Sequence, residues 1–161
     1  MQLYVKGKFS NKERFEIYDE FDSVRYMVMA EFGFGHKIHI YDAYDKEIGY
    51  IESFSKNLMT QYHLYDEDGL IDDLTRKFSF KKSVYRLEKL NWKISAATIW
   101  EQHYDFTCDG ENIGEINVEK NILKEGYYVN VKYENDELLA LMITMCIACD
   151  RADAAAAAAA A

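Results

Sequence analysis

Apolar and polar residues alternate along most of this chain. The order apolar, polar, aliphatic, Tyr, Asp occurs at 15–19, 38–42 and 62–66, so it recurs after 23 and then 24 residues. Weaker copies follow at 85–88, 104–107 and 129–133. Successive side chains of a β-strand point to opposite faces, so the alternating apolar residues of each copy share one face. The pattern predicts a series of strands whose common apolar face forms a single core.

A partner strand accompanies each copy, and several of the connections contain an Asp that favours a tight turn. Six units of two strands give twelve strands in all. We expect these strands at residues 2–8, 13–18, 24–32, 36–42, 47–54, 60–66, 70–78, 83–88, 92–99, 103–108, 112–119 and 127–133.

One stretch departs from this alternation. Residues 138–149 carry no charge, and Asn135, Asp136 and Glu137 precede them as a cap and an acidic first turn. An α-helix rises about 1.5 Å per residue, so this stretch spans about 18 Å, short of the roughly 30 Å of a bilayer core. We therefore expect no transmembrane span. A helix that is apolar on all sides must instead be buried in protein.

The helix fits inside a barrel made of the predicted strands. Strands about 4.8 Å apart and tilted by about 40° close into a ring roughly 24 Å across, and side chains narrow its interior to about 12 Å. That width accommodates one helix, whereas an open sheet would expose two edges. We predict a mainly β fold, a closed twelve-stranded antiparallel β-barrel threaded by one apolar C-terminal α-helix. Residues 1–153 form this single domain, and the alanine run 154–161 is interpreted as a tag or placeholder tail.

Composition and charge narrow the classes of function. The chain has 19 basic and 28 acidic residues and a net charge of −9, which disfavours broad nucleic-acid binding. Three Cys residues cannot all pair with one another, and no apolar run follows the first charged residue as in a signal peptide. We therefore expect a cytoplasmic protein.

Basic residues concentrate in one segment. Residues 76–93 contain seven basic residues against Glu88 alone, whereas the remainder has 12 basic against 27 acidic residues. Arg76 has the strand parity of the apolar positions 74 and 78, so it faces outward only if a bulge intervenes. The alternative interpretation is an ordinary solvated surface. The candidate patch for an anionic ligand or an anionic membrane surface consists of Arg76, Lys77, Lys81, Lys82 and Arg86.

No arrangement of residues indicates catalysis or a cofactor. Cys146 and Cys149 have the spacing of a redox pair, but they end an apolar helix, where the helix dipole opposes a thiolate, so we expect core packing. The acidic run 66–73 lacks the ligand order of a calcium loop and is expected to form a hairpin turn. Too few zinc ligands accompany the histidines, which are His36, His39, His63 and His103. We therefore predict no enzyme activity, no cofactor and no metal site.

Four features together resemble a known family. They are the repeated units ending in Tyr-Asp, the Lys-Phe-Ser-Phe-Lys-Lys run at 77–82, the Leu-Asn-Trp-Lys-Ile segment at 90–94 and the apolar C-terminal helix. They are similar to the LURP-one-related family of the Tubby C-terminal-like superfamily, which also includes the phospholipid scramblases. The resemblance covers residues 1–150 and implies a twelve-stranded barrel around a central helix.

The resemblance implies less about function. Tubby domains bind phosphoinositides through basic residues and scramblases respond to calcium, but no Tubby lipid-binding position matches this chain. Together with the residues, it favours a non-enzymatic binding or scaffold module for a protein partner or an acidic small ligand. The alternative is binding of anionic phospholipid or phosphoinositide headgroups at the membrane surface, as a peripheral protein. A further alternative, a scramblase-like protein, requires a membrane-inserted helix, which the length of 138–149 disfavours.

Overall fold

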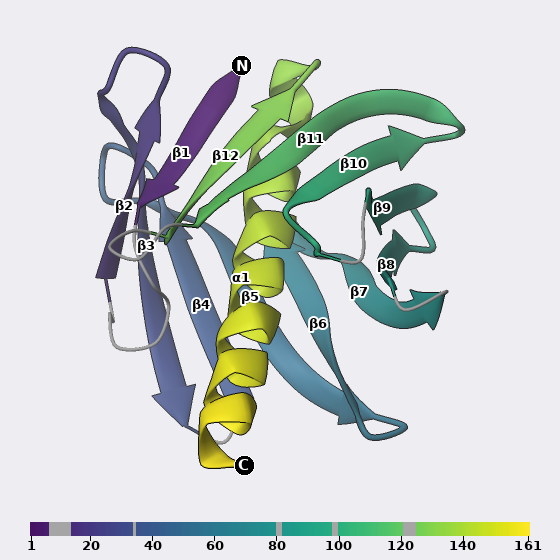
Figure 1. The fold of residues 1–161 in the computed structure, drawn as a ribbon. Coiled ribbons are helices and arrows are strands. Elements are labelled where there is room, and N and C mark those ends of the chain that lie inside the picture. Colours follow the sequence, from purple (N-terminus) through teal and green to yellow (C-terminus); the bar gives the residue numbers. More distant parts are fainter. Residues whose placement is uncertain (7–13, 34, 80–81, 98–99, 121–124) are drawn as a thin grey trace.

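A computed structural model of the chain describes residues 1–6, 14–33, 35–79, 82–97, 100–120 and 125–161. In these ranges, antiparallel strands close into a barrel around one long helix (Figure 1). Each strand pairs with its neighbours in sequence, and β1 pairs with β12 to complete the ring. The strands are β1 (Gln2–Lys6), β2 (Arg14–Asp19), β3 (Val24–Gly33), β4 (Gly35–Tyr41), β5 (Glu47–Lys56), β6 (Met59–Asp66), β7 (Gly69–Ser79), β8 (Lys82–Leu87), β9 (Trp92–Ala96), β10 (His103–Cys108), β11 (Glu111–Lys120) and β12 (Glu125–Val131).

The closed barrel confirms the predicted fold, and all twelve strands overlap their expected ranges. The strand boundaries differ from the predicted ones where strand pairing, or the connection that follows, sets the end of a strand. β5 runs to Lys56 rather than residue 54 because pairing with β6 continues to the turn, where Lys56 faces Met59. β12 ends at Val131 rather than residue 133 because the chain then turns towards the central helix.

The repeated Asp residues form turns at one end of the barrel. Oδ1 of Asp19 accepts hydrogen bonds from two backbone N–H groups of the β2–β3 connection, both at 2.9 Å. Oδ1 of Asp42 accepts two such bonds in the β4–β5 connection, at 2.8 and 3.0 Å. Oδ1 of Asp66 accepts one from Asp68 in the β6–β7 turn, at 2.9 Å. Side-chain bonds of this kind stabilise turns, so the Tyr-Asp repeat ends each strand where a hairpin begins.

The helix α1 (Glu137–Ala160) fills the barrel, as predicted (Figure 1). All of its residues from Ala140 to Asp150 are buried. Gly49 of β5 faces the helix, and a Cβ at this position would lie only 2.5 Å from Cε of Met142. A glycine here therefore lets the strand approach the helix closely.

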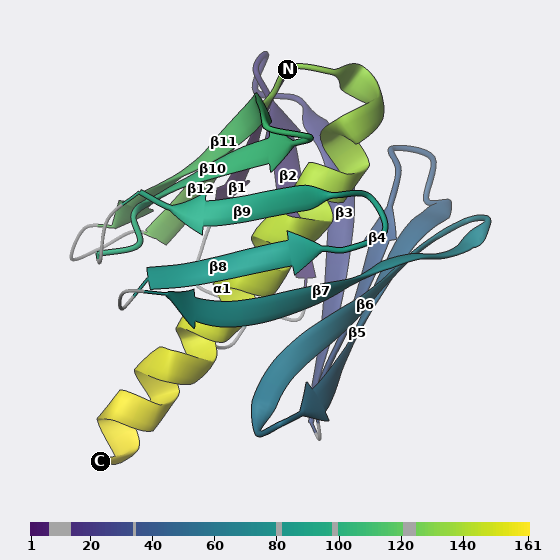
Figure 2. The ribbon, with the colours of Figure 1, turned by 90° about the vertical axis from the view of Figure 1, so that its right-hand side faces the viewer.

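The two ends of α1 differ from the prediction. A 3₁₀ turn (Glu134–Asp136) precedes the helix, and Asp136 occupies the N-cap position without a side-chain cap hydrogen bond, contrary to the predicted cap. The helix also continues to Ala160, because alanine has the highest helix propensity. Figure 2 shows these last turns projecting past the strands.

Candidate functional site: an outer basic face

The basic segment 76–93 lies on three neighbouring strands, β7, β8 and β9. The pairing of β7 with β8 shows no shift from Leu74 to Ser79, so the alternation of faces is unbroken. Arg76 consequently faces the barrel interior opposite Tyr85, and no bulge turns it outward. This is a correction to the predicted patch, because Arg76 lies on the other side of the sheet from its sequence neighbours. Lys81 lies outside the described residues.

Four basic side chains lie on the outer side of these strands. We call them the basic face: Lys77, Lys82, Arg86 and Lys93. Arg86 and Lys93 are direct cross-strand partners, and like charges in this position destabilise a sheet. Among the described residues, the other cross-strand partners of the face are uncharged: Thr75, Ser79, Val84 and Thr107. Positive charge therefore accumulates here without an acidic residue directly opposite.

Trp100 is 74% exposed, and its neighbour in sequence, Glu101, contacts β8 at Ser83, next to Lys82 of the basic face. Oε1 of Glu101 accepts the Ser83 backbone N–H at 2.8 Å. Nζ of Lys82 also donates to the Ala97 carbonyl at 3.2 Å. An exposed Trp beside cationic side chains is typical of a membrane–water interface. Trp100 lies between two predicted strands, 92–99 and 103–108, so no alternation pattern singles it out in the sequence.

Arg76 belongs to a buried polar network at the end of the barrel where α1 leaves it. The Asp150 carboxylate accepts hydrogen bonds from the hydroxyls of Tyr62 and Tyr85, both at 2.6 Å. Nη1 of Arg76 lies 3.7 Å from the same carboxylate, and Nη2 donates to Oγ of Ser83 at 2.8 Å. The network supplies partners for a charge inside the barrel, which is a structural role.

Burial of this network shifts the pKa values of its acidic and phenolic groups. Desolvation raises the pKa of Asp150, although the two tyrosine hydroxyls and Arg76 act in the opposite direction. Desolvation, together with the Asp150 charge, raises the pKa of Tyr62 and of Tyr85, so both hydroxyls stay protonated and donate.

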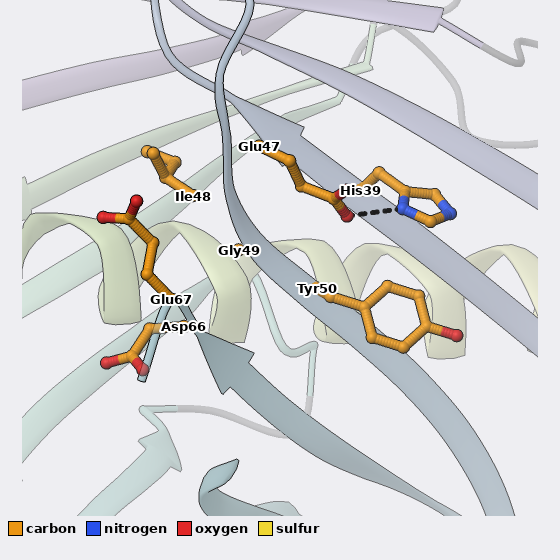
Figure 3. Close-up of a pocket in the computed structure, with 7 residues that line it drawn as sticks. All are labelled: His39, Glu47, Ile48, Gly49, Tyr50, Asp66 and Glu67. Carbon is orange, nitrogen blue, oxygen red and sulfur yellow. Dashed lines mark hydrogen bonds and ion pairs between the residues drawn. The ribbon is translucent and has the colours of Figure 1, made fainter. Parts of the chain in front are cut away.

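A second outer region lies on β4, β5 and the β6–β7 turn. Nδ1 of His39 lies 2.6 Å from Oε1 of Glu47, and its ring centroid lies 4.9 Å from that of Tyr50. Figure 3 shows Glu47 pointing towards His39, whereas Asp66 and Glu67 lie on the other side of the β5 ribbon. In this region, Glu47 is therefore paired with His39. This acidic hollow of about 380 Å³ is lined by His39, Glu47, Ile48, Gly49, Tyr50, Asp66 and Glu67.

The remaining sequence candidates lie apart from one another. Cys146 and Cys149 are buried in α1, and burial raises the pKa of both thiols, which disfavours a reactive thiolate. Asp72 is buried inside the barrel, whereas Asp73 lies 2.5 Å from Nδ1 of His63 on the outer side. The acidic run 66–73 therefore does not converge on one point.

Comparison with known proteins assigns the family. A sequence model of LURP-one-related proteins matches residues 1–150. The chain belongs to this family. Its LURP-one-related relatives include the uncharacterized protein YxjI of Bacillus subtilis, which is 28% identical over 151 residues, or 91% of each chain. An X-ray structure of a protein from Arabidopsis thaliana has a TM-score of 0.55 at 11% identity, covering 89% of this chain and 88% of that chain, and this likeness shows the fold alone.

The family assignment confirms the predicted resemblance, but it assigns no ligand to the basic face or to the acidic hollow. Within the part of the LURP-one-related chain that the structure describes, no helix has both the length and the apolar character needed to cross a bilayer.

Proposed function

We propose that this LURP-one-related protein is a non-enzymatic binding module whose basic face binds anionic phospholipid headgroups at a membrane surface. The opposed pair Arg86 and Lys93 carries the proposal. Two facing cations cost folding stability, and an anion placed between them removes the repulsion. Trp100 supports it, because its exposed ring suits the headgroup region. The proposal includes a cytoplasmic location, since the cytoplasmic leaflet is rich in anionic lipid.

The expected binding is weak and depends on salt. Each basic residue near an anionic surface contributes about 1 kcal/mol, so the four residues of the basic face give about 4 kcal/mol. This free energy corresponds to a Kd on the order of 1 mM. The rest of the chain weakens binding to an anionic surface, because the residues outside 76–93 include 12 basic and 27 acidic residues. Binding should therefore be clear on strongly anionic vesicles at low salt and fall towards physiological salt, where the Debye length is about 8 Å.

Co-sedimentation with vesicles tests the proposal. We expect wild type to sediment with vesicles rich in phosphatidylserine and to stay in solution with pure phosphatidylcholine. The double change Arg86→Glu and Lys93→Glu should abolish sedimentation. The matched control is Lys56→Glu with Lys120→Glu, which alters the net charge by the same amount at exposed positions on β5 and β11 and should sediment like wild type.

Two further outcomes decide the interpretation. If both double variants are folded and both sediment like wild type, the basic face does not bind lipid, and a protein partner becomes the better hypothesis. If both lose sedimentation equally, net charge rather than this face governs binding. Trp100→Phe should remove the blue shift of Trp fluorescence on anionic vesicles, because Trp92 is buried and does not meet lipid.

A further inference from the structure

A histidine and two carboxylates converge on the outer side of β10 and β11. His103 and Asp105 are two residues apart on β10 and so share a face, and Glu115 is the direct cross-strand partner of Asp105. Nε2 of His103 lies 3.1 Å from Oδ1 of Asp105 and 3.7 Å from Oε2 of Glu115. One potential ligand atom from each residue lies within 4.8 Å of the other two.

These separations suit a metal ion placed between the three groups. Zn²⁺ binds imidazole nitrogen and carboxylate oxygen at about 2.0–2.2 Å, so two ligands of one tetrahedral ion lie about 3.4 Å apart. The distances from Nε2 of His103, 3.1 and 3.7 Å, fall on either side of this value. Three protein ligands would leave a fourth position for water or for an external ligand.

Neighbouring amides orient the two β10 side chains. Nδ1 of His103 lies 2.6 Å from Oδ1 of Asn117. When Nδ1 carries the proton and donates it to this oxygen, the lone pair of Nε2 points towards the carboxylates. Nδ2 of Asn112 donates to Oδ1 of Asp105 at 3.3 Å. Metal-binding histidines and carboxylates commonly have such outer partners, which fix the tautomer and the orientation of the ligand.

The two carboxylates face each other without a Lys or Arg directly across the strands. The second cross-strand neighbour of Asp105 is Ser95, and that of Glu115 is Asn130. Within the described ranges, the ion pairs of both carboxylates are made with His103. Like charges directly opposite each other destabilise a sheet, so a cation between them would stabilise this one.

His39 shows the contrasting arrangement. Oε1 of Glu47 lies 2.6 Å from its Nδ1, and Oε2 of Glu31 lies 3.9 Å from its Nε2. The carboxylates therefore approach different ring nitrogens, which one ion cannot contact together. At His103, both carboxylates approach the same nitrogen. His39 thus provides a matched control for a histidine that has acidic neighbours without convergent ligands.

We propose that His103, Asp105 and Glu115 form a binding site for a divalent transition-metal ion, with Zn²⁺ as its probe. One imidazole and two carboxylates suit such ions, whereas Ca²⁺ and Mg²⁺ prefer oxygen ligands alone. No metal site was predicted because too few zinc ligands accompany the histidines along the sequence. Here the ligands come instead from acidic residues on the same strand and on its partner.

Isothermal titration of chelator-treated protein with Zn²⁺ tests the site. We expect one ion per chain, and a loss of affinity of more than about tenfold in Asp105→Asn and in Glu115→Gln. His39→Gln should bind like wild type. Cys108→Ala should do so as well, which separates the site from the partly exposed thiol at the end of β10. Addition of Zn²⁺ should raise the melting temperature of wild type and of both controls only.

The ligand variants are expected to fold, because the three side chains are 32%, 42% and 41% exposed, and circular dichroism checks this. Three results would overturn the proposal. One is no saturable binding at millimolar Zn²⁺. Another is binding by Asp105→Asn and Glu115→Gln with wild-type affinity. The third is loss of binding in Cys108→Ala while those two variants retain it.

Discussion

The two sides of the β7–β8 strand pair carry positive charge in different ways. On the inner side, Arg76 meets Ser83 and the carboxylate of Asp150. On the outer side, Arg86 faces Lys93, and Lys77 faces an uncharged residue. An unpaired charge inside the barrel would cost several kcal/mol, whereas water screens a charge on the outside. The buried partners of Arg76 therefore explain its position, whereas Arg86 and Lys93 face each other without an acidic partner directly opposite.

A new charge inside the barrel should have the largest effect. Leu141 and Ile143 have no exposed surface and lie on α1 without polar partners like those of Asp150. We expect Leu141→Asp or Ile143→Asp to prevent soluble expression, because an unpaired buried charge costs several kcal/mol against a total stability of about 5–15 kcal/mol. Leu141→Met, which keeps the volume, should express normally. A melting temperature near wild type in either Asp variant would contradict the central position of the helix.

Removal of the inner acceptor should have the next largest effect. Asp150→Ala takes away the acceptor shared by Tyr62, Tyr85 and Arg76. We expect urea denaturation to show a loss of about 3–5 kcal/mol, the usual cost of breaking a buried pair. Asp153→Ala is the control, because its carboxylate is 52% exposed and should cost less than about 1 kcal/mol. Equal losses of unfolding free energy in the two variants would mean that the buried Asp150 network contributes no more stability than the exposed Asp153 carboxylate.

The sequence predicted the barrel because its signal is local and repeated. Alternation in segments such as 38–42 defines the inner face, and the Asp after each Tyr defines the turn. The uncharged stretch 138–149 required a buried helix, and the barrel provides the interior that holds it. The cap predicted within residues 135–137 makes no side-chain hydrogen bond, and a 3₁₀ turn over residues 134–136 precedes the helix instead.

The candidate site was less predictable because it depends on contacts between strands. Parity already indicated that Arg76 faces inward unless a bulge intervenes, and the unbroken β7–β8 pairing shows that none does. Lys93 was counted in the basic segment, but its position opposite Arg86 follows from the β8–β9 register. The pairing of β10 with β11 also places Glu115 opposite Asp105, and the spacing of these two residues in the sequence does not indicate this contact.

The inner carboxylate should also respond to pH. Burial raises the pKa of Asp150, so its contribution to stability is present below the unfolded pKa of about 3.9 and is lost as pH rises through the folded pKa. Asp150→Asn removes this titration. The free energy of unfolding of the variant minus that of wild type should therefore rise as pH increases above about 4, by at most about 1.4 kcal/mol per pH unit. The opposite trend would mean that Arg76 and the tyrosines keep Asp150 ionised.

A change on the outer side should have the smallest effect on stability. Lys93→Glu replaces a like-charge pair with an opposite-charge pair to Arg86, so we expect a gain of about 0.2–1 kcal/mol in urea denaturation. The same change should weaken sedimentation with anionic vesicles, since the basic face loses two units of charge. Lys93→Gln should give an intermediate value in both measurements, because it removes the repulsion without adding an attraction. If Lys93→Glu is less stable than wild type, the two side chains are not repelling each other, and the main argument for an anionic ligand at this face is lost.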